Sequence, residues 1–208
     1  MQSDVLKIKD KVVIGTKRSV ANIVVPHGVT AIGDEAFHHC HLLTSLTIPN
    51  SVKRIGNHAF DGCSGLTSLT IPNSVDTIGN YAFQSCSGLT FLTIPNSVDT
   101  ICNGAFYGCR SLTSVSLPHG LDTVGSRAFG DCKSLTSVVF RPPASRAFIA
   151  WAVGNSRHRD NWQLTTLKRL RNVLRLVVML SVEVRDVSTV DPGGRDYVFR
   201  GCTKLIVS

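Results

Sequence analysis

The sequence is dominated by a unit of 23 residues that occurs five times in succession without a gap. The third unit reads TSLTIPNSVDTIGNYAFQSCSGL, and the fourth reads TFLTIPNSVDTICNGAFYGCRSL. The five units occupy residues 21–43, 44–66, 67–89, 90–112 and 113–135. A fixed period of this length is typical of a solenoid, in which each unit packs only against its neighbours. Solenoids usually present a surface to a partner, so the repeat by itself indicates a class of role.

Each unit has two halves with different hydrophobic patterns. In the first half of the third unit, Ser68 and Thr70 alternate with apolar residues, as a half-buried strand requires. Pro72 then ends the strand because it has no N–H to donate. The apolar spacing of the second half predicts a short helical or 3₁₀ turn. Its apolar residues are Val75, Ile78, Ala82, Phe83 and Cys86.

The combined pattern over residues 66–86 is L-x-x-L-x-I-P-x-x-V-x-x-I-G-x-x-A-F-x-x-C. It resembles the BspA-like class of leucine-rich repeats, and the resemblance extends over residues 21–140. The resemblance implies an α/β leucine-rich-repeat solenoid with a concave parallel β-sheet and short helical or 3₁₀ turns on the convex side. It also implies a binding role, since most such proteins are described only as binding proteins of bacterial surfaces or of unicellular eukaryotes.

The chain divides into four segments. Residues 1–20 contain two short apolar runs around Asp10 and Lys11, which predicts an N-terminal hairpin cap. Residues 21–140 hold five full units and the start of a sixth, which fails at two consecutive prolines. Residues 141–184 predict a basic helical segment, and residues 185–208 contain a degenerate partial repeat. Because the sequence stops part-way into another predicted strand, we expect a fragment or a truncated product.

Five of the seven cysteines share one register of the repeat: Cys40, Cys63, Cys86, Cys109 and Cys132. Disulfide scaffolds do not show this spacing, and a free thiol packs as a small apolar residue. We therefore expect buried packing thiols, with disulfides and metal or redox chemistry as alternatives. Cys102 replaces a glycine of the repeat, and the sequence shows no neighbour that would activate it. Drift within the repeat is the better interpretation of Cys102.

The outward positions of the predicted strands form a candidate partner-binding face on the concave side. They are Ser45, Thr47, Ser68, Thr70, Phe91, Thr93, Ser114 and Ser116, followed by Ser137 and Val139. Phe91 is an aromatic residue in the middle of a wall of hydroxyls. The functional interpretation is a shallow protein-binding face anchored by Phe91, because central aromatic residues often supply binding energy. The alternative is that Ser and Thr simply cover a solvated sheet.

The formal net charge of +8 comes mostly from the end of the chain. Residues 1–140 carry 10 Lys and Arg against 9 Asp and Glu, whereas residues 141–208 carry 12 against 5. The basic patch contains Arg157, Arg159, Lys168, Arg169, Arg171 and Arg175. Such a patch binds acidic proteins, nucleic acid or anionic membrane surfaces. The alternative is an amphipathic helix that caps the solenoid and keeps its charges hydrated.

Histidines cluster at His38, His39 and His41 around Cys40, with His58 one unit further on. A tetrahedral zinc site needs four convergent ligands, so we expect no metal site and no cofactor. Phosphate-binding glycine loops, nucleophile elbows and zinc-protease motifs are all missing from the sequence. The aspartates at 76, 99 and 122 recur at the repeat interval, which indicates a structural position of the unit rather than a catalytic group. The sequence therefore favours a binding protein over an enzyme.

Compartment signals are weak. The first 15 residues lack the apolar run of a secretory signal, and no apolar stretch reaches the roughly 20 residues that cross a bilayer. The sequence also lacks an Asn-x-Ser/Thr acceptor. These features favour an intracellular chain whose partner is another protein. A surface or adhesion protein is the alternative if the sequence is a fragment.

Overall fold

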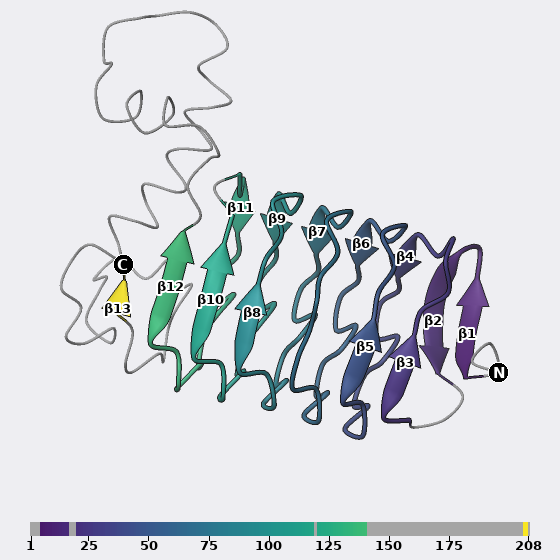
Figure 1. Cartoon of the computed structure of the whole chain (residues 1–208), viewed down its shortest axis with the longest axis horizontal. Helices are drawn as coiled ribbons and strands as arrows, with labels where there is room; N and C mark the ends of the chain where they lie inside the picture. Colours follow the sequence, from purple (N-terminus) through teal and green to yellow (C-terminus); the bar gives the residue numbers. More distant parts are fainter. Residues whose placement is uncertain (1–4, 17–19, 119, 141–205, 208) are drawn as a thin grey trace, which may run out of the picture.

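The computed structural model describes residues 5–16, 20–118, 120–140 and 206–207. The repeat units form coils that lie side by side along the long axis of the molecule (Figure 1). The coils form two rows of strands, one of very short strands and one of longer strands to which the third coil contributes no strand. The stacked coils confirm the solenoid architecture.

The row of short strands is a seven-stranded sheet. It begins with a hairpin of β1 (Leu6–Lys9) and β2 (Val12–Thr16), which pair antiparallel. β2 then pairs parallel with the first coil, so the hairpin lies against the end of the stack. The remaining strands have two residues each and are β4 (Ala31–Ile32), β6 (Arg54–Ile55), β7 (Thr77–Ile78), β9 (Thr100–Ile101) and β11 (Thr123–Val124).

The row of longer strands is divided into two sheets. The first contains β3 (Asn22–Val24) and β5 (Ser45–Thr47). The second has the order β13-β12-β10-β8. Its strands are β8 (Phe91–Thr93), β10 (Ser114–Leu117), β12 (Ser137–Phe140) and β13 (Ile206–Val207). The third coil has no strand in this row, although its alternation of buried and exposed residues is the predicted one.

The prediction of helical or 3₁₀ turns is wrong within the residues that the structure describes, where the second half of each unit forms successive turns without a helix. In the third coil the N–H groups of Tyr81, Phe83 and Ser85 donate to carbonyls of the fourth coil at 2.9, 2.7 and 2.8 Å. Tyr81 and Ser85 also have positive φ angles of 53° and 55°. The bonds within the segment, such as the Gln84 N–H to the Tyr81 carbonyl at 3.1 Å, alternate with these bonds between coils and close only single turns. A right-handed helix requires negative φ and an unbroken series of bonds within the segment, so these turns do not join into one.

The predicted basic helical segment, residues 141–184, lies outside the described residues, as does the partial repeat up to residue 205.

The core is a set of side-chain ladders running through the stack. The rings of Phe37, Phe60, Phe83, Phe106 and Phe129 are fully buried, and successive centroids lie 4.9, 5.0, 5.2 and 5.2 Å apart with interplanar angles of 7° or less. This spacing equals the distance between coils, so each ring stacks on its equivalent in the next coil. Buried leucines and cysteines form parallel ladders beside them. Four of the five cysteines predicted to be buried packing thiols are fully buried, and Cys40 is partly buried.

A polar ladder that the sequence analysis did not identify joins the coils at their surface. The Asn57 side-chain oxygen accepts hydrogen bonds from the Asn80 backbone N–H at 2.9 Å and from the Asn80 side-chain amide at 3.1 Å. The same register begins at Asp34 and continues through Asn103 to Ser126. This ladder can be recognised in the sequence as an Asp or Asn in four successive units. It directly follows the position that is glycine in most units.

Candidate partner-binding face

The longer strands and the equivalent segment of the third coil present one continuous set of outward side chains, called here the strand face. The residues that alternate with these outward side chains along each strand, such as Leu69, Leu92 and Val115, point inward and are buried. This alternation follows from the period of two along a strand. The strand face consists of Asn22, Val24, Ser45, Thr47, Ser68, Thr70, Phe91, Thr93, Ser114, Ser116, Ser137 and Val139.

The pairing register places the strand-face residues in two ranks. Phe91 lies opposite Ser114, and Thr93 lies opposite Ser116. In the other sheet, the outward residues of β3 lie opposite Ser45 and Thr47. Strands in a sheet are about 4.8 Å apart, so equivalent hydroxyls repeat at that interval. The structure therefore brings these predicted residues into one face, with the segment of Ser68 and Thr70 between the two sheets.

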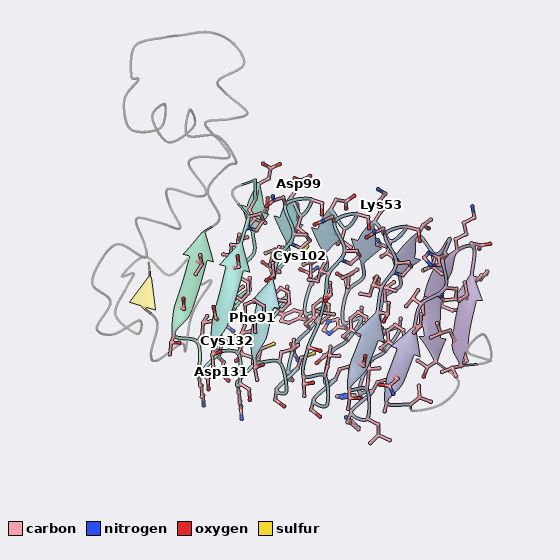
Figure 2. All side chains as sticks on the ribbon, viewed as in Figure 1. Lys53, Phe91, Asp99, Cys102, Asp131 and Cys132 are labelled. Carbon is pink, nitrogen blue, oxygen red and sulfur yellow. The ribbon has the colours of Figure 1, made fainter. Side chains whose placement is uncertain are left out.

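Phe91 is the most exposed aromatic side chain of the strand face, with 57% of its surface accessible to solvent. Figure 2 labels it at β8. The aliphatic side chains of Val24 and Val139 are exposed to 43% and 39%. A large apolar side chain that loses this exposure on binding releases water from about half of its surface.

The backbone of the segment next to Phe91 in the strand face is not paired with its neighbours. Among the described residues, no hydrogen bond joins the backbone of 67–71 to either neighbouring coil. The inward side chains Leu69 and Ile71 retain exposures of 8% and 5%, close to the 7% and 8% of Leu46 and Ile48 in the second coil, whereas Leu92 and Ile94 retain none. This slight exposure is therefore greatest in the second and third coils and absent from the fourth, which carries Phe91.

The thiols are not activated for chemistry. Burial raises the pKa of Cys63 and of Cys109 to about 12, and it raises the pKa of Cys86 well above its ordinary value. Burial also raises the pKa of the partly exposed Cys102. A reactive cysteine needs a lowered pKa, so these thiols remain protonated and weakly nucleophilic at neutral pH. Cysteines 40, 63, 86, 102, 109 and 132 are all free.

The histidine cluster gathers around a carboxylate that the sequence analysis did not include. Asp61 is buried, and its Oδ2 lies 3.1 Å from Nδ1 of His58 and 3.7 Å from Nε2 of His38. Within the described part of the chain, no group of three or more His, Cys, Asp or Glu side chains has an arrangement that holds a metal ion. Asp61 occupies the same position of its unit as His38 does in the preceding unit. This shared position was the sequence signal that could have placed the carboxylate beside the histidines.

The recurrent aspartates lie on the side of the short strands, away from the strand face. Their backbones are adjacent, since the N–H of Asp99 donates to the carbonyl of Asp76 at 2.9 Å and the N–H of Asp122 donates to the carbonyl of Asp99 at 2.8 Å. Figure 2 shows Asp99 and Lys53 at this edge of the stack.

The predicted basic patch, Arg157 to Arg175, lies outside the described residues. No helix long and apolar enough to span a membrane occurs in the part of the chain that is described.

Comparison with known families gives a match to the BspA type leucine rich repeat region over residues 7–136, in six copies. Leucine-rich repeat solenoids generally serve as non-catalytic binding scaffolds, and the match indicates no enzyme family. Comparison with curated proteins gives no match.

Several solved bacterial structures share the fold. A T. pallidum leucine rich repeat protein is 33% identical over 61% of this chain and 62% of its own, with a TM-score of 0.58. A Bacteroides ovatus leucine-rich repeat protein is 39% identical over 57% of this chain and 31% of its own, with a TM-score of 0.54. A Faecalibacterium prausnitzii leucine rich cell surface protein is 26% identical over 72% and 39%, with a TM-score of 0.60. The chain spans less than two thirds of each of these proteins.

Proposed function

This chain belongs to the BspA-type leucine-rich repeat family, and from that membership we propose that it binds another protein through the strand face, with Phe91 as the anchor. The observation that carries the proposal is the 57% exposure of Phe91 within a regular face of short hydroxyl side chains. Exposed aromatic residues near the centre of an interface commonly account for much of its binding energy. The surrounding Ser and Thr side chains are short, so they leave the ring accessible.

The architecture favours a binding role over a purely structural one. The inward side chains are fixed by the ladders of the core, so the outward side chains keep their spacing without a partner. A preformed surface loses little conformational entropy on binding. Burial keeps the thiols of Cys86 and Cys109 protonated near neutral pH, so neither is available as a nucleophile.

The proposal is tested by affinity capture with matched variants of the full chain. The Phe91→Ala variant removes the anchor, and Ile14→Ala removes a side chain of similar exposure, 52%, on the N-terminal hairpin. A partner retained by the wild type and by Ile14→Ala but lost with Phe91→Ala supports the strand face. Retention of the same partner by all three proteins contradicts it.

A second pair of variants tests the face independently of Phe91. Thr70→Arg places a long cation on the strand face, and Ser64→Arg places the same cation in the register of Arg110 and Lys133, where the solenoid already carries positive charge. We expect loss of the partner with Thr70→Arg only. Equal binding by both variants would move the interface elsewhere.

Binding through the basic patch, Arg157 to Arg175, is the rival proposal. Contacts with phosphates or an acidic partner weaken steeply as salt rises, whereas contacts of an uncharged face do not. A salt titration of the captured complex separates the two.

Display at a cell surface is the second candidate role. It is favoured by the similarity to the Faecalibacterium prausnitzii protein, which is described as a cell surface protein. Fractionation of the native host, followed by detection of the chain with a specific antibody, tests this role against an intracellular one.

A further inference from the structure

No outward side chain of the strand face carries a charge. Its twelve residues are Ser, Thr, Asn, Val and Phe. Charged residues occupy the other surfaces of the same coils: Lys53 and Asp99 lie on the side of the short strands, and Asp131 lies on the turns (Figure 2). The strand face is therefore electrically neutral over all of its described coils, although the solenoid carries both signs of charge elsewhere.

The hydroxyls of the strand face are also unused within the molecule. The hydroxyls of Thr44, Thr113 and Thr136, which precede the strands, donate to carbonyls of the preceding coil at 3.1, 2.8 and 3.1 Å. In contrast, the side chains of Ser68, Thr70 and the other strand-face residues make no hydrogen bond to the described part of the protein. Their donors and acceptors remain available to a partner.

The apolar part of the face lies where the sheet is interrupted. Phe91 borders the segment 67–71, and the inward side chains of that segment are slightly exposed. A partner side chain that covers Phe91 buries the exposed part of its ring. This site favours an aliphatic or aromatic side chain, because burial of apolar surface on both sides releases water.

We propose that the strand face recognises an uncharged protein segment, with an apolar side chain over Phe91 and Ser, Thr, Asn or Gln side chains over the two ranks of hydroxyls. This inference rests on the proposed function and specifies the chemistry of the partner. A charged side chain placed over the face would lose hydration without meeting an opposite charge, which disfavours binding. Neutral polar side chains exchange hydrogen bonds with water for hydrogen bonds with the free hydroxyls at little cost.

The test is selection of a phage-displayed library of random peptides on the immobilised full chain. Peptides of about 12 residues are long enough to cross the face. Selections on Phe91→Ala and Ile14→Ala run in parallel. We expect the enriched peptides to be depleted of Asp, Glu, Lys and Arg relative to the starting library and to contain an apolar residue. Their affinity should fall at least about tenfold with Phe91→Ala and stay unchanged with Ile14→Ala.

The affinity of the enriched peptides should change less than about twofold between about 50 mM and about 500 mM salt, because no charge pair contributes to binding. Charged peptides that bind through Phe91 with a steep salt dependence would overturn the inferred chemistry and leave the strand face as the site. Enriched peptides indifferent to Phe91→Ala and Thr70→Arg would overturn the site itself, and with it the proposed function.

A neutral glycan is the competing occupant, since sugar rings also pack on aromatic side chains and bond to hydroxyls. Failure to enrich any peptide over the Phe91→Ala background, together with binding of the wild type to an array of neutral glycans, would overturn the proposal in favour of a carbohydrate partner. Absence of enrichment without glycan binding counts equally against it.

Discussion

The thiol of Cys86 donates a hydrogen bond to the backbone carbonyl of Phe60, one coil earlier, across 3.2 Å. Equivalent bonds join Cys63 to Phe37 at 3.1 Å and Cys109 to Phe83 at 3.3 Å. The register of cysteines therefore does more than fill space. Each of these thiols donates a second hydrogen bond to a carbonyl that already accepts a backbone N–H within its own coil, and it can do so only while it is protonated.

This relationship predicts a loss of stability at alkaline pH. Thiols of an unfolded chain ionise near pH 8.5, whereas burial raises the pKa of Cys109 to about 12 and raises that of Cys86 as well. The contribution is therefore complete below about pH 8.5 and is lost progressively as pH rises toward 12, by about 1.4 kcal/mol per pH unit for each such thiol. Denaturant unfolding between pH 7 and pH 10 measures this slope.

The control is Cys86→Ala, which should be less stable at pH 7 but should lose less stability as pH rises. A slope equal to that of the wild type would show that lysines or tyrosines, rather than the thiols, cause the alkaline instability.

Removal of one ring from the phenylalanine ladder should be severe. Phe83 is fully buried between Phe60 and Phe106, with centroids 5.0 and 5.2 Å away. We expect Phe83→Ala to reduce the free energy of unfolding by about 3–5 kcal/mol, because the cavity cannot close between two fixed rings. Phe91→Ala is the matched control and should cost less than about 1 kcal/mol, since its ring is largely exposed. Similar losses for both variants, measured by chemical denaturation, would contradict the ladder.

The asparagine ladder should contribute measurably although it lies near the surface. Asn80→Ala removes the acceptor of the Asn103 N–H and the amide that donates to Asn57. We expect a loss of about 0.5–1.5 kcal/mol, because hydrogen bonds between coils are lost at a site that water reaches. Asn73→Ala makes the same change at a turn residue whose side chain has no hydrogen bond to the described protein. A comparable midpoint of thermal unfolding for the two variants would show that water replaces the ladder.

Gly79 lies in close contact with the preceding coil, although the next unit accommodates Cys102 at the equivalent position. A Cβ at this position would lie 2.6 Å from the carbonyl carbon of Gly56 and 2.8 Å from the Asn57 nitrogen, which are backbone atoms that cannot rotate away. Gly79→Ala should therefore destabilise the protein by about 1–3 kcal/mol. Gly120→Ala provides the control, since the nearest atom to its Cβ would be 4.0 Å away. Unfolding curves that shift equally for both would refute the steric explanation.

The 23-residue period determined most of the architecture. Residues that repeat at a fixed interval occupy equivalent places in successive coils, so the ladders of Phe, Leu and Cys and the outward positions of Ser and Thr followed from the sequence. The hydroxyl face and the exposure of Phe91 were predictable for the same reason. The asparagine ladder also recurs at one position of the unit, and Asp61 occupies the position of His38, but polar residues near turns give no hydrophobic signal.

Only the tertiary structure decided how the backbone hydrogen bonds are shared between coils. The apolar spacing after Pro72 suits a helix as well as a series of turns. The turns form because the N–H groups of Tyr81, Phe83 and Ser85 bond to the next coil. The interruption at residues 67–71 is equally invisible in the sequence, since TSLTIPNSV there differs from TFLTIPNSV in the next unit by one residue. Strand pairing depends on the distance between neighbouring coils, and that distance is set by the packing of the whole stack.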